Sequence, residues 1–158
     1  MKVVAVIGKY FGTYPEIDKH IFLARQLARM VWDMGGFGVF TPHLNTAHFE
    51  ALTKVNEPTY QEFDRLVLER LVDGAIVLPN WRASSGSRKE IAYMNLLNKP
   101  VFDDLATMVM WRDGADAHLF RGVQNVDGVK YWITGSSGVQ KPPLSLGVGT
   151  DIDKLLNY

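Results

Sequence analysis

The chain has no cysteine, which excludes disulfide bonds, thiolate metal sites and a cysteine nucleophile. It also has no excess of charge, because 17 basic residues balance 17 acidic ones. A neutral chain is a poor ligand for nucleic acid or for an anionic membrane, and we expect neither as a partner. No apolar run reaches the roughly 18 residues of a membrane span, and the amino terminus does not resemble a signal peptide. The lack of cysteine is compatible with the cytoplasm, the location that we expect.

Several common functional motifs are also missing. The sequence contains no G-x-G-x-x-G fingerprint, no G-x-x-x-x-G-K-[ST] loop and no G-x-S-x-G elbow. These absences disfavour dinucleotide binding, nucleoside triphosphate chemistry and an α/β-hydrolase serine. His43 and His48 lie five residues apart in a predicted loop, which is not the spacing of a helical zinc site, so we expect no metal and no cofactor. His20 is predicted on the solvated face of the first helix.

Short apolar runs alternate with segments of helical periodicity over most of the 158 residues. Strands are predicted at residues 3–7, 37–41, 74–78 and 100–102. A first helix begins at Pro15 and ends before Gly35, and a second follows Pro58. Residues 42–46 are predicted as a polar loop. The pattern of residues 48–58 is ambiguous, and a loop is one interpretation of it. This alternation predicts one α/β domain with a doubly wound, mostly parallel sheet of the flavodoxin or Rossmann type.

The second predicted helix has a helical pattern with one acidic residue, Asp64, on a neighbouring face. The residues that carry the pattern are Phe63, Leu66, Val67, Arg70 and Leu71.

The pattern weakens after residue 103. Residues 123–126 and 129–133 flank Asp127-Gly128, which predicts a hairpin. Residues 135–149 are rich in Gly, Ser and Pro, and they predict a loop or an extended arm before a short helix capped by Thr150. We therefore expect residues 1–103 to form the α/β core and residues 104–158 to be an irregular extension of the same domain.

Residues 78–90, LPNWRASSGSRKE, are the most informative stretch of the chain. They place Ser84, Gly86, Ser87 and Glu90 where a buried strand ends and a helix begins, and open α/β sheets bind ligands at such junctions. Free N–H groups at a helix start suit an anion, and a glycine there lets the chain approach a ligand closely. The carboxylate of Glu90 lies in the same turn. This pairing indicates that one of the two groups, the helix start or the carboxylate, holds a ligand while the other does chemistry.

Asp64 and Glu90 stand out as a pair of carboxylates. One lies on the helix that leads into the third predicted strand, and the other lies on the helix that leaves it. Cleavage of a glycosidic bond needs two carboxylates across a pocket. The alternatives are that Asp64 is a surface charge beside Arg65, and that Glu90 only stabilises its helix, with Ser84 or Ser85 as the cap.

Four aromatic residues could either pack in the core or contact a ligand. Trp81, at a strand end, is either a core or rim residue or a surface for stacking a base or sugar. Tyr131, Trp111 and Trp132 fit packing better than ligand contact.

Taken together, residues 2–103 resemble the nucleoside 2-deoxyribosyltransferase superfamily, including its 2′-deoxynucleoside 5′-monophosphate N-glycosidase branch and small phage-type relatives. The elements that carry the resemblance are the first strand ending in Gly8, the Ala24-Arg25 helix, residues 40–45 (FTPHLN), Asp64, residues 73–79 (DGAIVLP), and Trp81-x-x-Ser84-x-Gly86-Ser87-x-x-Glu90. The last of these is long and ordered, and it is the most specific.

The resemblance implies a role for each matching residue. Glu90 would be the nucleophile that attacks C1′ of the deoxyribose, and Asp64 would help to protonate the departing base. Ser84 would hold the 5′ end of the sugar, where a neutral side chain tolerates a phosphate. Gly8, Lys9 and Tyr10 would complete that anion site, His43 and Asn45 would lie at the neighbouring strand end, and the protein would be a homo-oligomer. The acceptor would be water or a second base, and two alternatives are a transferase acting on free nucleosides and an inactive nucleotide-binding module.

The sequence departs from the family in two places. Relatives carry a tyrosine in the first strand that orients the nucleophile, whereas this chain has Ala5, so Tyr10, Tyr14 or Tyr93 would have to replace it. Relatives also complete the pocket with residues from a neighbouring subunit near the carboxyl end, and residues 104–158 match no such element.

Overall fold

The computed structural model describes residues 1–135. The arm predicted at residues 135–149, apart from Gly135, and the helix predicted after Thr150 lie outside the described residues. Within the described part of the chain, no helix has the length and apolar character that a membrane crossing requires.

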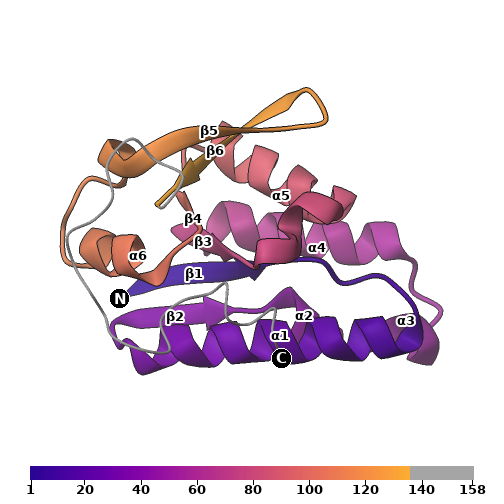
Figure 1. The fold of residues 1–158 in the computed structure, drawn as a ribbon. Coiled ribbons are helices and arrows are strands. Elements are labelled where there is room, and N and C mark those ends of the chain that lie inside the picture. Colours follow the sequence, from indigo (N-terminus) through magenta and orange to yellow (C-terminus); the bar gives the residue numbers. More distant parts are fainter. Residues whose placement is uncertain (136–158) are drawn as a thin grey trace.

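A single six-stranded sheet forms the centre of the molecule (Figure 1). The strands are β1 (Lys2–Ile7), β2 (Phe37–Phe40), β3 (Gly74–Val77), β4 (Val101–Phe102), β5 (Arg121–Val126) and β6 (Val129–Thr134). Their order is β2-β1-β3-β4-β6-β5, and only β5 runs antiparallel to its neighbour. The predicted doubly wound, mostly parallel sheet is therefore confirmed. The hairpin around Asp127-Gly128 also forms, and it extends the sheet beyond β4.

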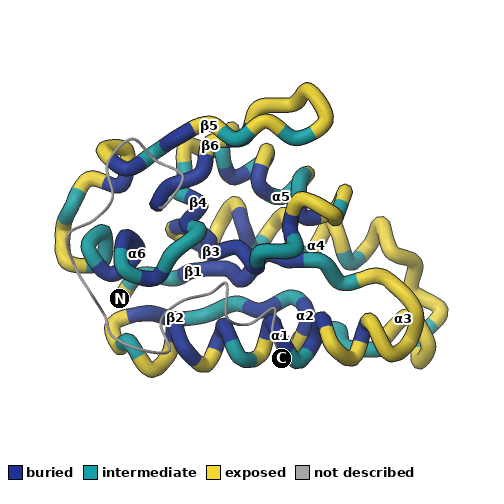
Figure 2. Tube along the Cα trace, viewed as in Figure 1, coloured by how far each residue is buried: buried dark blue, intermediate teal, exposed yellow. Residues whose placement is uncertain are grey.

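Helices cover both faces of this sheet. The long helices are α1 (Tyr14–Asp33), α4 (Glu57–Arg70), α5 (Ser85–Leu96) and α6 (Leu105–Arg112). Side chains of α1 and α6 pack in one hydrophobic cluster, and side chains of α4 and α5 pack in a second cluster on the other face. The shorter elements are α2 (Pro42–Asn45), α3 (Phe49–Leu52), η1 (Pro79–Ala83) and η2 (Ala117–Phe120). Burial follows these layers, with the central strands enclosed and the outer helix faces exposed (Figure 2).

The strand order places a topological switch point beside β1. The chain leaves β1 for β2 on one side and returns to β3 on the other side. The two central strands end together, because Ile7 of β1 pairs with Val77 of β3. At such a point the loops diverge and leave a crevice at the carboxyl edge of the sheet. Gly8 lies in this crevice, and a Cβ atom there would lie only 2.9 Å from Cβ of Leu78, so the close approach requires glycine.

Two sequence predictions are wrong in detail. Residues 42–45 form the short helix α2 instead of a loop, and residues 49–52, whose pattern was ambiguous, form the short helix α3. His20 is buried rather than solvated, and its Nδ1 donates to the carbonyl oxygen of Tyr10 at 2.7 Å. The two helices have four residues each, which is too short for an apolar periodicity to emerge.

The residues that carry the helical pattern of the second predicted helix, α4, do not reach the core as a group. Leu68 is the single fully buried residue of α4, whereas Phe63 and Leu66 are 48% and 39% exposed. The face that α4 turns inward carries polar side chains instead, as described below.

Candidate active site

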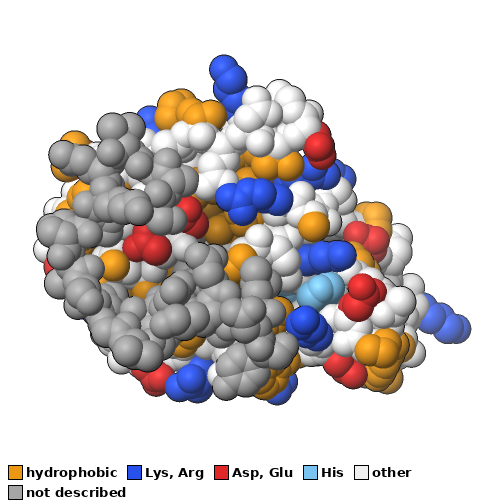
Figure 3. All heavy atoms as spheres, viewed as in Figure 1, with side chains coloured by type: hydrophobic (Ala, Val, Ile, Leu, Met, Phe, Trp, Pro, Cys, Tyr) orange, Lys and Arg blue, Asp and Glu red, His pale blue; other side chains and the backbone are white. Residues whose placement is uncertain are grey.

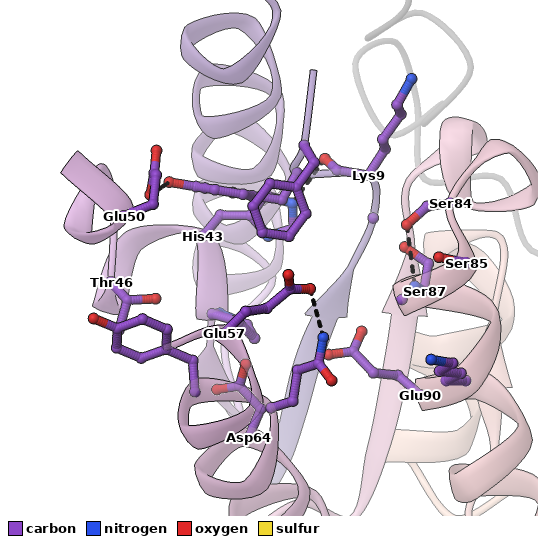
Figure 4. Close-up of a pocket in the computed structure, with 18 of the residues that line it drawn as sticks. Lys9, His43, Thr46, Glu50, Glu57, Asp64, Ser84, Ser85, Ser87 and Glu90 are labelled. Carbon is purple, nitrogen blue, oxygen red and sulfur yellow. Dashed lines mark hydrogen bonds between the residues drawn. The ribbon is translucent and has the colours of Figure 1, made fainter. Parts of the chain in front are cut away.

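A cavity of about 560 Å³ lies in the crevice at the carboxyl edge of the sheet. This volume is within the range of small-molecule sites, about 300–1,000 Å³. Its walls come from the end of β1, from α2 and α3 with the segment after them, from α4 and from the start of α5 (Figure 4). The lining residues are Gly8, Lys9, Tyr10, Phe11, Pro42, His43, Thr46, Glu50, Val55, Glu57, Tyr60, Gln61, Asp64, Ala83, Ser84, Ser85, Gly86, Ser87, Lys89 and Glu90.

Most of the predicted site residues line this one cavity. They are Gly8, Lys9, Tyr10, His43, Asp64, Ser84, Gly86, Ser87 and Glu90. Asp64 and Glu90 are thus brought together from two helices, as their positions on either side of β3 predict.

Two predicted residues lie elsewhere. Trp81 is 1% exposed and packs edge-on against Tyr131 in the core below α5. Its indole is therefore a core residue and does not stack on a ligand, which corrects the prediction of substrate contact. Asn45 lines a separate, shallower groove between α1 and β2. It follows His43 by two residues on α2, so it points to a different side of that short helix.

Asp64 and Glu90 point into the cavity from facing walls (Figure 4). Burial raises the pKa of Asp64 to about 6. Burial, with a further contribution from the charge of Asp64, raises the pKa of Glu90 to about 8. Both carboxylates are half-buried, and both line the cavity. At neutral pH the pair therefore holds a single proton, so one carboxylate is an anion and the other an acid.

The start of α5 forms the end of the cavity that lies away from Asp64 (Figure 4). Ser84 is the cap of this helix, and its Oγ accepts a hydrogen bond from the N–H of Ser87 at 3.1 Å. The N-cap alternative is thus confirmed for Ser84, whose hydroxyl proton remains available to a ligand. The N–H groups of Ser85 and Gly86 belong to the first turn, where a helix has no internal acceptors. Lys9 lines the same end, and Figure 4 shows its side chain extending away from the two carboxylates.

Three polar side-chain atoms at the cavity are buried without a partner within residues 1–135, and they are Nδ1 of His43, the hydroxyl of Tyr60 and Oγ of Ser87. Ser87 is 2% exposed, and its Oγ makes no hydrogen bond there. His43 is 5% exposed and donates from Nε2 to the carbonyl oxygen of Lys9 at 3.0 Å. Burial lowers the pKa of His43, so the ring is neutral and its unpartnered Nδ1 is a hydrogen-bond acceptor. Unpaired buried groups are costly, so each is a group that a ligand would satisfy.

Tyr10 does not contact Glu90 and so does not take the role that the sequence resemblance implies for a first-strand tyrosine. The side chain of Ala5 is fully buried beneath α4 and α5. The hydroxyl of Tyr10 donates to Glu50 at 3.0 Å and accepts from the N–H of His48 at 2.9 Å. Burial is the main cause that raises the pKa of Tyr10 to about 12, so it stays protonated. This hydroxyl ties α3 to the loop after β1 and is not bonded to Glu90.

Tyr14 and Tyr93 also have other partners. The ring of Tyr14 stacks on His48 with 5.0 Å between ring centroids. The hydroxyl of Tyr93 donates to Glu69 at 3.0 Å, outside the cavity. Within the described part of the chain, no tyrosine is hydrogen-bonded to Glu90.

The polar wall that α4 contributes was not predicted from the sequence. Its cavity residues are Glu57, Tyr60, Gln61 and Asp64, and the amide of Gln61 donates to Glu57 at 2.6 Å. These positions repeat every three or four residues, which is the signature of one helix face. The helical spacing of this cavity face was therefore present in the sequence, but polar residues carried it rather than apolar ones.

No arrangement of His, Asp and Glu side chains suited to a metal ion occurs within residues 1–135. On the face shown in Figure 3, acidic and basic side chains are interspersed, in keeping with the zero net charge.

Searches against family models, curated proteins and solved structures found no match to this chain.

We predict that Glu90→Gln stabilises the fold. Between its ordinary pKa of 4.5 and its folded pKa of about 8, the folded state keeps a proton on Glu90 that the unfolded state releases. Wild-type stability must therefore fall as pH rises across that interval, and the neutral glutamine removes this penalty. The free energy of unfolding in urea should be higher for the variant by about 2–4 kcal/mol at pH 8, with little difference at pH 4. A Glu90 that only stabilised its helix would give the opposite sign.

Proposed function

We propose that the protein cleaves the bond between base and deoxyribose in 2′-deoxynucleoside 5′-monophosphates. The observation that carries this proposal is the pair of half-buried carboxylates, Asp64 and Glu90, which face each other across a cavity that ends at the start of α5. The carboxylates supply a nucleophile and an acid, and the helix start supplies donors for an anion.

In the first step, a carboxylate oxygen of Glu90 forms a bond to C1′ while the N-glycosidic bond breaks. The electron pair of that bond moves to the nitrogen of the base, which takes a proton from Asp64. In the second step, water attacks C1′, its proton returns to Asp64, and the carboxylate of Glu90 leaves. Two displacements at one carbon retain its configuration.

The proton shared by the two carboxylates is consistent with this mechanism. The empty site favours the proton on Glu90, because its pKa of about 8 exceeds the value of about 6 for Asp64. The reaction needs the proton on Asp64, and the two forms interconvert within one singly protonated pair. Positive charge that develops on the sugar in the transition state favours the ionised form of Glu90.

The rate of base release should therefore show a bell-shaped dependence on pH. The singly protonated pair is the active form, so kcat/KM should rise with an apparent pKa near 6 and fall with one near 8. The measurement is the initial rate of base release from one deoxynucleoside monophosphate across pH 4–10. A rate independent of pH in this range would contradict the proposed roles.

The 5′-phosphate fits the end of the cavity formed by α5. The N–H groups of Ser85 and Gly86, the hydroxyl of Ser84 and the ammonium group of Lys9 are all donors, and they line the same end. The opposite wall is acidic, through Glu50, Glu57 and Asp64, and would repel a phosphate. We therefore infer one orientation of the substrate, with its phosphate at α5 and its base toward α4.

Replacing Ser84 with aspartate should select against the phosphate. Aspartate caps a helix as well as serine does, so the fold should be retained, but its charge would oppose the phosphate. We expect kcat/KM for the monophosphate to fall by about 100-fold, equivalent to about 2.7 kcal/mol. The nucleoside without a phosphate should be unaffected or improved. Ser84→Asn is the matched neutral cap, and it should keep most of the activity on the monophosphate; an equal loss in both variants would contradict the phosphate assignment.

One observation favours a second candidate, a nucleotide-binding module without activity. Ala5 replaces the tyrosine of relatives, and no tyrosine within residues 1–135 is bonded to Glu90. Calorimetry that found tight binding of deoxynucleoside monophosphates, together with no release of base, would select this candidate.

A further inference from the structure

The hairpin of β5 and β6 forms one edge of the sheet, and β5 is its outermost strand (Figure 1). β5 has six residues and no proline, whereas β2 at the opposite edge has four residues. An edge strand leaves a row of backbone N–H and C=O groups unpaired, and natural proteins usually shorten or block such an edge. The edge of β5 is therefore a candidate surface for a partner.

The register of the hairpin decides which backbone groups of β5 point outward. The two-residue turn at residues 127–128 has positive φ at both positions, so the flanking residues Val126 and Val129 are a hydrogen-bonded pair. Hydrogen-bonded and non-hydrogen-bonded pairs alternate along an antiparallel ladder. Val123 and Trp132, three positions along, are therefore a non-hydrogen-bonded pair, and their backbone groups point away from each other.

The side chain of Asn95 confirms this geometry. Its Nδ2 donates to the carbonyl oxygen of Trp132 at 3.0 Å, and its Oδ1 accepts from the N–H of Trp132 at 2.9 Å. The backbone groups of Trp132 thus point toward α5 and away from β5. The N–H and C=O groups of Val123 and Asn125 point outward on the other side of the hairpin, and within residues 1–135 no hydrogen bond to them is present.

Two further side-chain contacts fix the hairpin to η1 and α5. Arg82 donates to Gln124, and Arg88 pairs with Asp127 at 2.7 Å. A strand that is already held in an extended conformation binds a second strand at a lower entropic cost. The free edge of β5 is therefore a rigid template and not a frayed end.

The side chains on the exposed face of the hairpin define the chemistry of the partner. They alternate along both strands, and they are Arg121, Val123, Asn125, Lys130 and Trp132. Val123 and Trp132 form an apolar centre and are 45% and 43% exposed, and the guanidinium group of Arg121 lies over the ring of Trp132. Arg121 and Lys130 make this face positive, because the single acidic residue of the hairpin is paired with a cation of α5.

We propose that β5 binds an extended acidic peptide of another protein as a seventh strand of the sheet. The backbone of the peptide pairs with the outward N–H and C=O groups of Val123 and Asn125. Its side chains alternate between the two faces of the sheet, so every second one lies on the exposed face. The complementary pattern has an apolar residue beside Val123 and a carboxylate two residues to either side of it, toward Arg121 at one end and Lys130 at the other.

The test is fluorescence polarisation of a labelled peptide added to the full chain. The peptide has glutamate at its first and fifth positions, valine at its third position and threonine between them. We expect a dissociation constant of about 10–100 µM at low ionic strength. The same peptide with lysine in place of glutamate should bind at least about 10-fold more weakly. No binding of the acidic peptide up to about 1 mM, or equal binding of both peptides, would overturn the proposal.

Val123→Pro tests the backbone pairing. Proline removes the N–H that points outward, and this N–H takes no part in the ladder with β6, so the hairpin should be retained. The variant should bind the acidic peptide at least about 10-fold more weakly. Val123→Thr is the matched control, because it keeps the N–H and the branched shape, and it should bind within about 3-fold of the wild type. An equal loss in both variants would exclude strand pairing.

Lys130→Glu tests the charge and leaves the backbone unchanged. The side chain is exposed, so the variant decides the question even if Val123→Pro fails to fold. It should weaken binding of the acidic peptide and strengthen binding of the lysine peptide. Unchanged binding of both peptides would overturn the assignment of an acidic partner.

Two other occupants of this edge would give different results. Pairing of β5 with β5 of a second copy would appear in sedimentation of the protein alone, as self-association that Val123→Pro abolishes. Nucleic acid on this face would appear as displacement of the peptide by a single-stranded oligonucleotide. Either result would overturn the proposal. None of these measurements uses a substrate, so their outcome is independent of the proposed function.

Discussion

Replacing Glu90 with glutamine is expected to lower the rate of base release from deoxynucleoside monophosphates by at least about 10⁴-fold. The amide keeps the size of the side chain but is not a nucleophile, so the bond to C1′ cannot form. Because the same change should stabilise the fold, lost activity could not be attributed to unfolding. The measurement is the chromatographic yield of free base from each substrate over hours.

Glu69→Gln is the matched control. Glu69 is an exposed residue of α4 outside the cavity, and glutamine can still accept the hydrogen bond from Tyr93. This variant should release base at the wild-type rate. Full activity in Glu90→Gln would show that Glu90 is not the nucleophile.

Replacing Asp64 with asparagine should lower the rate by about 10²–10⁴-fold, the range for loss of a general acid. Asparagine cannot protonate the departing nitrogen. The change also removes the charge that helps to raise the pKa of Glu90, so the pKa of Glu90 should move down toward its ordinary value. The high-pH limb, which reports loss of the proton from the pair, should disappear from the rate profile.

A deoxyribosyl substrate with a good leaving group would separate the two roles. Departure of such a group needs no proton, so Asp64→Asn should regain most of its rate with it, whereas Glu90→Gln should not. Asp33→Asn, at an exposed ion pair of α1, is the control and should behave as wild type with both substrates. If Asp64→Asn lowered the rate by the same factor with both substrates, Asp64 would not be the acid.

Much of the fold could be predicted because local patterns agreed with the final packing. The buried strands β1 and β3 are continuous apolar runs, and the long helices between strands begin and end near Pro and Gly. Parallel pairing then brings the loops after β1 and β3 to one edge, which is how Gly8 and Glu90 could be placed in one site.

The orientation of α4 could not be predicted from its periodicity. Apolar residues and polar residues both repeat at helical spacing along this segment, on different faces. An apolar stripe ordinarily marks the inner face, but here the inner face lines a polar cavity and keeps Asp64 in it. The pattern reveals that two faces exist, and only the packed structure shows which one faces the sheet.

The position of Trp81 depended on contacts that are distant in sequence. A tryptophan at a strand end can face a ligand or turn inward. The 3₁₀ turn at Pro79–Ala83 turns Trp81 inward, where Tyr131 of the later hairpin packs against it. The location of that hairpin in the sheet is set by the pairing of β6 with β4, which no local pattern encodes.

The covalent intermediate can be detected by mass spectrometry of the protein after rapid mixing with a deoxynucleoside monophosphate and acid quenching. We expect a deoxyribose 5-phosphate adduct on the peptide that contains Glu90, present in the wild type and absent from Glu90→Gln. Base release with no adduct, or an adduct on another residue, would show that Glu90 does not attack the sugar.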